Sequence, residues 1–300
     1  MGARPRDDEG VSPVRRQEAA AGDRSPAAVS ARYGGAVTAT GARGAGAAPA
    51  RQTLAVLERQ LVLFRRVWRG SVFSSLILPV LFLLSMGIGV GGYVGELEGA
   101  PYLQWIVPGL LSMTAFEIAL VESTYPVMSD FKWTRAYFAI SATPVGVAGI
   151  LQGWLLYLVL RVVLAVAVFL VVAAGFGGLA SPWAVVAPLV CTVLTLAVAA
   201  PVTAFAAVVD SDSYFALLFR FAMVPSSLFG GVFFPVERLP AAAQAAAQAT
   251  PLWHAVELNR AATLGIPPAW PVAAHLAYLA VWGGVGCVLA AVAFRRRLYR

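Results

Sequence analysis

Uninterrupted apolar segments of about 20 residues constrain the fold of this 300-residue chain more than any other feature. A helix of that length spans the hydrocarbon core of a bilayer, whereas apolar stretches in soluble domains are usually shorter. The composition agrees, because 59% of the residues are hydrophobic and only 12% are charged. We predict an all-α integral membrane protein with six transmembrane helices, at residues 72–94, 103–128, 147–176, 183–209, 215–234 and 269–294.

Two segments precede the first predicted span. Residues 1–50 are rich in Ala, Gly, Arg, Pro and Ser and contain no apolar run, so we expect a disordered cytoplasmic tail rather than a signal peptide. Residues 51–300 would form a single transmembrane domain that begins with an amphipathic helix at residues 51–68. Such a helix suits the headgroup plane of a membrane, although a solvated helix packed on a soluble partner is an alternative. Its predicted apolar face consists of Leu54, Leu57, Leu61 and Phe64.

The distribution of basic residues predicts the orientation in the membrane. The net charge is +7, and it comes almost wholly from arginines that flank the apolar segments. With both termini on the cytoplasmic side, the outer loops carry only Arg238 and Arg260, as the positive-inside rule expects. We therefore predict a multi-pass protein of the bacterial cytoplasmic membrane, in contact with lipid. Nucleic-acid binding is not expected, because no stacking aromatics interleave with a basic stripe.

Motifs for catalysis or metal binding are missing from the sequence. It contains no GxxxxGK[ST] loop and no GxSxG elbow, and its single lysine is Lys132. His254 and His275 are far apart in sequence and lie in no HExxH or CxxC context, so a zinc site is not expected. Cys191 and Cys287 fall in apolar segments, where cysteine acts as a small hydrophobe. We expect no catalytic residue, cofactor or metal.

Glu117, Glu122 and Arg161 are charged residues within the predicted spans, and Arg220 lies a little inside the fifth span. A charge at membrane depth costs about 2.5–3.5 kcal/mol on insertion scales, so each needs a partner or a wet cavity. We predict that Glu117 pairs with Arg161 on the next antiparallel helix, with lining of a conduit as the alternative. Glu122 lies five positions after Glu117, about 140° further round the helix, so the two carboxylates do not form one stripe.

The loop between the second and third predicted spans combines aromatic and charged residues. These side chains are either interfacial anchors or a docking element for a cytoplasmic partner. We favour docking, through Phe131, Lys132, Trp133, Arg135 and Tyr137.

A polar segment interrupts the apolar pattern between the fifth and sixth spans. Prolines and glycines break it into short pieces, and charge counting places it on the outer side. Backbone of this kind is tolerated only at a membrane boundary or in space lined by protein. We predict that Glu257 is the partner of His254, one helical turn away, and that Glu257 and Arg260 hold the segment together rather than touch cargo. Its key residues are Phe233, Phe234, Pro235, Pro251, His254, Glu257 and Arg260.

The same segment resembles the ABC-2 family of export permeases, in the branch that contains nodulation lipo-oligosaccharide and drug-resistance exporters. The resemblance rests on Phe229-Gly230-Gly231-Val232-Phe233-Phe234-Pro235, Leu239-Pro240 and Pro251-Leu252-Trp253-His254 followed by Glu257-Leu258 and Arg260. Supporting matches are Gly87-Ile88-Gly89-Val90-Gly91, Tyr102 with Pro108-Gly109, and Glu122-Ser123-Thr124-Tyr125. Two features depart from the family pattern: Gly230 replaces a serine, and residues 132–136 lack an acidic residue.

The resemblance implies a permease that works as a homodimer or heterodimer with separate ATPase subunits, which would hydrolyse ATP. It implies ATPase contacts at residues 51–68 and 130–138, and a re-entrant helical hairpin at residues 237–264 near an outer exit. Sparse charge and aromatics such as Trp105, Trp154 and Phe205 favour export of an amphipathic substrate, whether a lipo-oligosaccharide, a lipid-like compound or a drug. The alternatives are a non-transporting assembly or sensor subunit and an ion-coupled secondary carrier. The sequence defines neither the substrate nor the identity of the second copy.

Overall fold

The computed structural model describes residues 2 and 48–299, and most of these from residue 49 onward are helical. The predicted tail therefore lies outside the described residues, apart from residues 2 and 48–50. Pro49 and Ala50 already belong to the first described helix, α3. The elements are α3 (Pro49–Phe82), the π-helix η1 (Leu83–Val90), α4 (Gly91–Val94), β1 (Glu96–Leu97), β2 (Ala100–Pro101), α5 (Tyr102–Glu122), α6 (Tyr125–Lys132), α7 (Ala136–Ser141), α8 (Val147–Gly175), the 3-10 helix η2 (Pro182–Val186), α9 (Ala187–Val208), α10 (Ser213–Leu218), the π-helix η3 (Phe219–Met223), α11 (Val224–Phe229), the 3-10 helix η4 (Val236–Arg238), α12 (Ala241–Gln248), α13 (Pro251–Leu264) and α14 (Val272–Leu298).

Four helical segments are long and apolar enough to cross a membrane: residues 102–132, 147–175, 182–208 and 272–298. They confirm the prediction of an all-α membrane protein and coincide with four of the six predicted spans. The other two predicted spans correspond to shorter apolar helices, at residues 79–94 and 213–229. Six crossings therefore stay a prediction.

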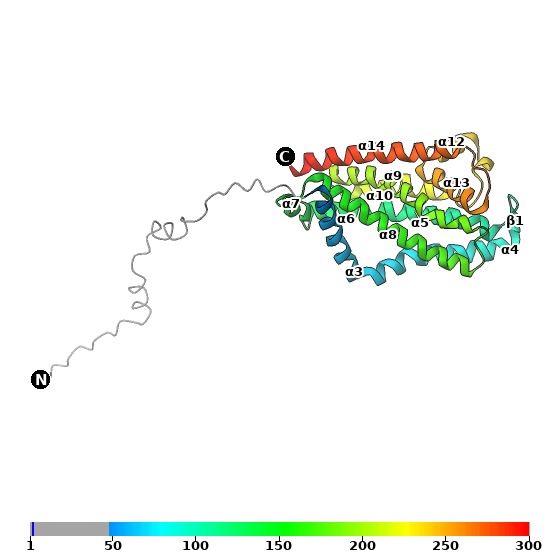
Figure 1. Cartoon of the computed structure of the whole chain (residues 1–300), viewed down its shortest axis with the longest axis horizontal. Coiled ribbons are helices and arrows are strands. Elements are labelled where there is room, and N and C mark those ends of the chain that lie inside the picture. Colours follow the sequence, from blue (N-terminus) through cyan, green and yellow to red (C-terminus); the bar gives the residue numbers. More distant parts are fainter. Residues whose placement is uncertain (1, 3–47, 300) are drawn as a thin grey trace. The chain divides into compact units, whose positions relative to one another are not determined.

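Helix α9 lies at the centre of the bundle and packs against α5, α8 and α14 (Figure 1). Its residues are mostly small, and Ala197, Ala199, Ala200 and Ala206 are buried. Small residues let neighbouring helix backbones approach closely. In lipid no hydrophobic effect acts between helices, so the van der Waals packing that this approach allows contributes to their association.

The predicted amphipathic helix and the beginning of the first predicted span form one continuous helix, α3. No proline interrupts residues 51–78, so nothing in that stretch ends the helix. The predicted apolar face is also corrected, because Leu54 and Leu61 are exposed whereas Val56 and Gln60 are buried against the bundle. Gly153 of α8 makes this contact possible, since a Cβ there would lie 2.6 Å from the Cβ of Val56.

The fifth predicted span ends earlier than its prolines suggest. The α10–η3–α11 segment stops at Phe229, six residues before Pro235. Gly231 follows with φ +81°, a left-handed conformation that favours glycine. The next residue, Val232, lies against α5 at Gly109, where a Cβ would be 2.7 Å from the Val232 carbonyl oxygen. The chain therefore turns onto α5 instead of continuing as a helix.

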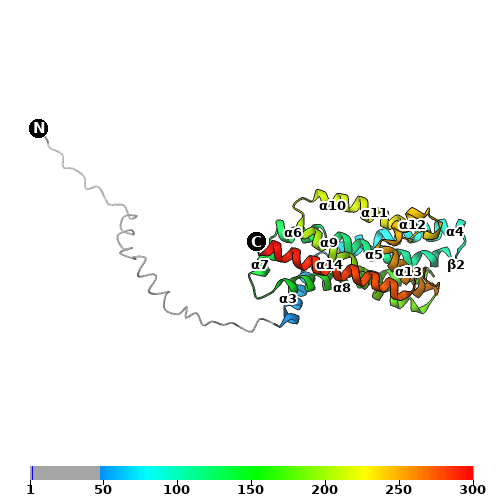
Figure 2. The ribbon, with the colours of Figure 1, turned by 90° about the horizontal axis from the view of Figure 1, so that it is seen from above.

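The molecule has two contrasting ends (Figures 1 and 2). The hairpin end comprises residues 95–101 and 230–271, with the β1–β2 pair, α12 and α13. The arginine end comprises residues 125–146, 209–212 and 295–299, with α6, α7 and the last turn of α14. Helix α5 starts at the hairpin end, and α6 follows its other terminus at the arginine end.

Candidate functional site

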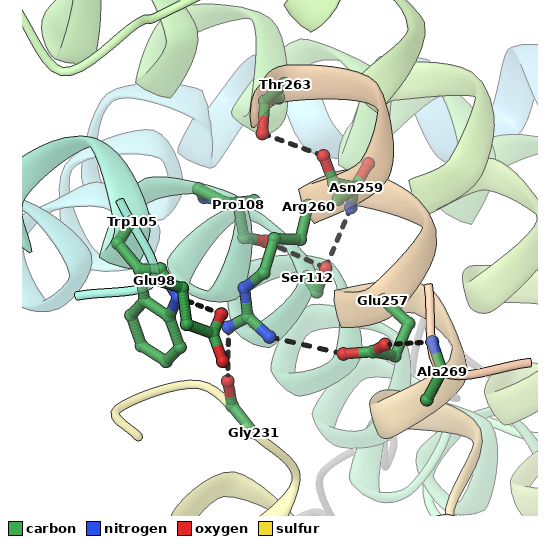
Figure 3. Close-up of polar contacts among 10 residues, drawn as sticks. All are labelled: Glu98, Trp105, Pro108, Ser112, Gly231, Glu257, Asn259, Arg260, Thr263 and Ala269. Carbon is green, nitrogen blue, oxygen red and sulfur yellow. Dashed lines mark hydrogen bonds and ion pairs between the residues drawn. The ribbon is translucent and has the colours of Figure 1, made fainter. Parts of the chain in front are cut away.

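Arg260 is the centre of the polar contacts at the hairpin end (Figure 3). It lies on α13 and is only 5% exposed. One guanidinium nitrogen donates to the Glu257 carboxylate at 3.2 Å, and another donates to the Gly231 carbonyl at 2.7 Å. The guanidinium carbon also lies 4.0 Å from the ring centroid of Trp105 on α5, which is a cation–π contact. This arginine thus joins α13, the turn after α11 and α5.

Glu257 extends the same network to the loop that precedes α14. Its second carboxylate oxygen accepts from the backbone N–H of Ala269 at 2.9 Å. Burial raises the pKa of this carboxyl above its ordinary value, and the bonds from Ala269 and Arg260 act against that rise. The contacts agree with the prediction that Glu257 and Arg260 hold the segment together. We call Arg260, Glu257, Trp105 and Gly231 the Arg260 cluster.

Sequence reasoning missed several members of this network. The Trp105 indole N–H donates to Glu98 at 2.9 Å, so the β1–β2 turn is tied to the base of the cluster. Directly before Arg260 on α13, the Asn259 amide donates to the Ser112 hydroxyl at 2.7 Å, and Ser112 donates to the Pro108 carbonyl. Asn259 is fully buried. An amide between Leu258 and Arg260 is the one sequence signal for this contact, because a buried amide requires a hydrogen-bond partner.

The prolines and phenylalanines of the predicted segment shape its backbone and its contact with the first helices. Pro251 occupies the first turn of α13, where its missing N–H costs nothing. The Phe233 ring packs on Phe82 at 5.4 Å, and its carbonyl accepts from the Tyr102 hydroxyl at 3.1 Å. Pro235 is buried, and Phe234 is half-buried. None of these residues carries a chemical group that could react.

His254 contacts His275, not Glu257, which corrects the predicted partner. The two Nδ1 atoms are 2.8 Å apart, and the His254 Nε2 lies 3.0 Å from the Gln248 carbonyl. Both ring nitrogens of His254 therefore have other partners, and the Glu257 carboxylate binds Arg260 and Ala269 instead. Distance in sequence was a poor guide here, since α13 and α14 bring the two histidines together. Among residues 48–299 no group of three His, Cys, Asp or Glu side chains could hold a metal.

The predicted pair of Glu117 and Arg161 does not form. Arg161 binds Glu122 instead, at 2.7 Å. The two carboxylates point to different sides of α5, and only Glu122 faces α8. Glu117 lies beside Pro79 and Phe82 of α3, and within the described part of the chain its carboxylate has no ion pair.

The predicted docking loop divides into buried and exposed residues. Phe131 and Tyr137 are buried in the chain's own core, where both pack on Phe294 of α14, so they cannot enter a partner. An alternating aromatic and charged pattern does not reveal which rings face inward. Trp133 is 57% exposed.

Charged residues fix the same loop to two other parts of the chain. Arg59 of α3 makes two hydrogen bonds to Asp130, at 3.0 and 3.2 Å. Lys132 donates to the Asp210 carbonyl after α9 at 3.0 Å. Arg135 is exposed and has φ +52°, which marks the sharp turn between α6 and α7. The loop is therefore a preformed surface rather than a mobile segment.

Comparison with known proteins agrees with this architecture. The family model described as ABC-2 type transporter matches residues 51–264. The chain belongs to the ABC-2 type transporter family. It is 28% identical to nodulation protein J of Rhizobium leguminosarum bv. viciae over 247 residues, which cover 82% of this chain and 95% of the relative. It is also 28% identical to the inner membrane transport permease YadH of Escherichia coli K12 over 214 residues, which cover 68% and 79%.

As an ABC-2 family member the chain is a membrane transport permease, a transporter subunit that is not itself catalytic. ABC-2 permeases in general work with an ABC ATPase. The matched region ends at the last residue of α13, so it contains the whole Arg260 cluster and leaves α14 outside. His275 lies in that unmatched part.

Proposed function

We propose that this chain is the permease subunit of an ATP-driven exporter that moves an amphipathic substrate out across the bacterial cytoplasmic membrane. The observation that carries the proposal is the placement of two rigid polar surfaces at opposite ends of α5. At one end Arg260 holds a broken polar segment on Trp105, and just past the other end Asp130 holds the exposed loop on Arg59. One helix can therefore transmit a push at the loop to the hairpin.

The arginine end faces the cytoplasm in this proposal, and the hairpin end faces outward. The last turn of α14 carries Arg295, Arg296 and Arg297, whereas acidic Glu96, Glu98 and Glu237 lie at the hairpin end. Positively charged loops are retained on the cytoplasmic side. Both termini would then be cytoplasmic, and α12 with α13 would form a re-entrant hairpin at the outer face.

The ATPase would dock on the exposed part of the loop, at Lys132, Trp133 and Arg135. A neighbouring apolar groove supports this assignment, because it runs between α3 and α7 and is lined by Ala55, Val56, Arg59, Ala139, Ile140 and Thr143. An exposed tryptophan beside an apolar groove and a fixed ion pair is typical of an interface hot spot.

The substrate path would run along the face shared by α3, α5 and the α10–η3–α11 segment. Glu117 is the one carboxylate of the described spans that faces α3, and Tyr214, Leu217, Phe221, Val224 and Leu228 form an exposed apolar stripe on the fifth segment. The stripe suits a second permease copy, identical or paralogous, or lipid. An amphipathic cargo such as a lipo-oligosaccharide, a lipid-like compound or a drug fits a path with so few charges.

Co-reconstitution with a candidate ABC ATPase subunit tests the proposal. We expect the permease to stimulate ATP hydrolysis and to move a fluorescent amphipathic probe out of the compartment that holds the nucleotide. A flat ATPase rate with the folded permease present would contradict the proposal.

Trp133→Ala tests the docking surface. We expect at least a tenfold loss of ATPase affinity, measured by titration of the two reconstituted subunits, because an exposed aromatic anchor is worth about 2 kcal/mol at an interface. The thermal midpoint should not change, since Trp133 is 57% exposed. Trp183→Ala is the matched control, because Trp183 is 68% exposed and lies on η2, away from the loop. Equal affinity for the two variants would place docking elsewhere.

A further inference from the structure

His254 and His275 are the only two histidines of the chain, and they share a single hydrogen bond. His254 comes from α13 of the hairpin, and His275 comes from the first turn of α14. Both side chains are fully buried, and their Nδ1 atoms lie 2.8 Å apart. No step of the proposed export function uses this pair.

Other contacts concentrate the attachment of the hairpin at the same place. The Tyr278 ring stacks on His254 with a centroid distance of 3.9 Å, and the Tyr278 hydroxyl donates to the Ala249 carbonyl between α12 and α13. Trp253 and Trp270 pack around the two imidazoles. The hairpin is therefore held on α14 by a small aromatic cage with the histidines at its centre.

The hydrogen bonds define which nitrogens carry protons. A carbonyl only accepts, so the His254 Nε2 that faces Gln248 must bear hydrogen. A neutral His254 then has a bare Nδ1, which accepts from the Nδ1–H of His275. A first added proton can be accommodated, because a charged His254 can donate to His275 instead. A second proton leaves two N–H groups and two positive charges facing each other, and the bond is lost.

The backbone carbonyls of Gln248 and Trp270 favour a charged imidazole, but among the described residues no carboxylate pairs with either histidine. On α13 the nearest carboxylate, Glu257, is already engaged by Arg260 and Ala269, and Glu98 and Glu237 act on Arg260. The α14 arginines and the α5 carboxylates Glu117 and Glu122 lie toward the other end. Helices α9, α11, α12 and η2 contain no charged residue. Burial, followed by the second imidazole, lowers the pKa of His254 to about 4.

We propose that His254 and His275 form a proton-sensitive latch that holds the hairpin on α14 near neutral pH and releases it in acid. The closed latch takes up protons poorly, whereas an opened hairpin exposes two ordinary imidazoles that bind them readily. Acidification therefore favours opening by mass action. The latch itself does not depend on the proposed function. Only the inference that it responds to acid outside the cell rests on the proposed function.

The sign of the effect follows from the depressed pKa. His254 titrates at about 4 in the closed state and at about 6.5 in an unfolded or opened chain. The opened state binds more protons between these two values, so the latch is fully closed above about pH 6.5 and weakens as the pH falls toward about 4.

Hydrogen–deuterium exchange of the full chain in lipid nanodiscs tests the latch, with rates corrected for intrinsic exchange. Peptides from residues 241–264 should open at least tenfold more often at about pH 5 than at about pH 7.5 in the natural protein. The double variant His254→Asn/His275→Asn contains no histidine, so its exchange should lose most of the pH response, and only titration of Glu257 should contribute to what is left. His275→Asn alone should give an intermediate response and serves if the double variant does not fold.

Tyr278→Phe is the matched control, because it removes a bond between the hairpin and α14 but no imidazole. Its exchange should be faster at both pH values and should keep the pH dependence of the natural protein. An unchanged rate in the natural protein, or an equal pH response in the histidine-free variant, would overturn the latch. The experiment needs neither ATPase nor cargo, so a chain that fails to export can still show the latch, and an exporter can fail to show it.

Discussion

Both ends of the molecule contain a buried or half-buried arginine over an aromatic ring, but the two arginines are neutralised differently. At the hairpin end Arg260 lies over Trp105 and binds the buried carboxylate of Glu257. At the arginine end Arg297 lies 4.8 Å from the ring centroid of Phe131 and donates to carbonyls at the C-terminus of α9. Its nearest carboxylate, on Asp210, is 4.0 Å away and 99% exposed.

This difference determines how well each arginine tolerates substitution. A helix C-terminus offers partial negative charge that needs no counter-charge when the arginine is removed, because water can replace the donor. A buried carboxylate has no such replacement, since an isolated buried charge is costly. Removing Arg260 from its pair with Glu257 should therefore be strongly destabilising. Removing Arg297, which caps the C-terminus of α9, should be only mildly destabilising.

Arg260→Met should reduce stability more than any other substitution considered for the two ends. It leaves Glu257 buried without its cation, and we expect a loss of about 3–5 kcal/mol in stability. The measurement is the thermal midpoint of the purified permease in detergent. The double variant Arg260→Met/Glu257→Gln should be more stable than Arg260→Met alone. If the double variant is worse, the cluster owes its stability to packing on Trp105 rather than to the charge pair.

The pair of Arg161 and Glu122 between the two ends gives an intermediate case. Its side chains are 14% and 19% exposed, so Glu122→Gln should cost about 1–3 kcal/mol through the loss of a charged hydrogen bond. Glu117→Gln is the matched control on the same helix and should change the thermal midpoint little. Swapping the charges of residues 122 and 161 together should recover part of the loss. An equal effect of the two single glutamine variants would contradict the pairing.

Arg297→Gln should have the smallest effect of the three. Glutamine can still donate to one α9 carbonyl, and the interaction of a cation with a helix C-terminus is worth about 0.3–1 kcal/mol at exposed positions. A downward shift of the thermal midpoint as large as that of Arg260→Met would show that the two ends are equivalent after all.

Much of the fold could be predicted from sequence because hydrocarbon tolerates so few backbones. Four apolar segments became long helices close to their predicted bounds, such as 147–176 against Val147–Gly175. The breaks were harder to locate. The fifth segment ends at Phe229, directly before Gly230 and Gly231 and not at Pro235. Helix α3 continues across the boundary that we predicted between an interfacial helix and the first span. Both outcomes depend on contacts, at Gly109 and Gly153, that residue type alone does not reveal.

The candidate site was predicted only in part, because Glu257 and Arg260 were among its expected residues whereas Trp105 and Asn259 were not. Glu257 and Arg260 are one turn apart on one helix, so their pairing follows from the helical repeat. His254 with His275, Arg161 with Glu122 and Arg260 with Gly231 join residues 21 to 39 positions apart, and helical periodicity has no information about such pairs. The burial of Phe131 and Tyr137 could not be predicted from the sequence for the same reason, because both rings pack on Phe294 near the C-terminus.

The sequence by itself determined that this protein is a helical membrane protein, because long uncharged apolar segments have no other stable solution in water or lipid. It also determined which polar residues lie in apolar surroundings and therefore require partners. Only the tertiary structure decided how those residues pair. The cost of a buried charge or imidazole is set by whichever group another helix places within about 3 Å, and that depends on how helices distant in sequence pack side by side.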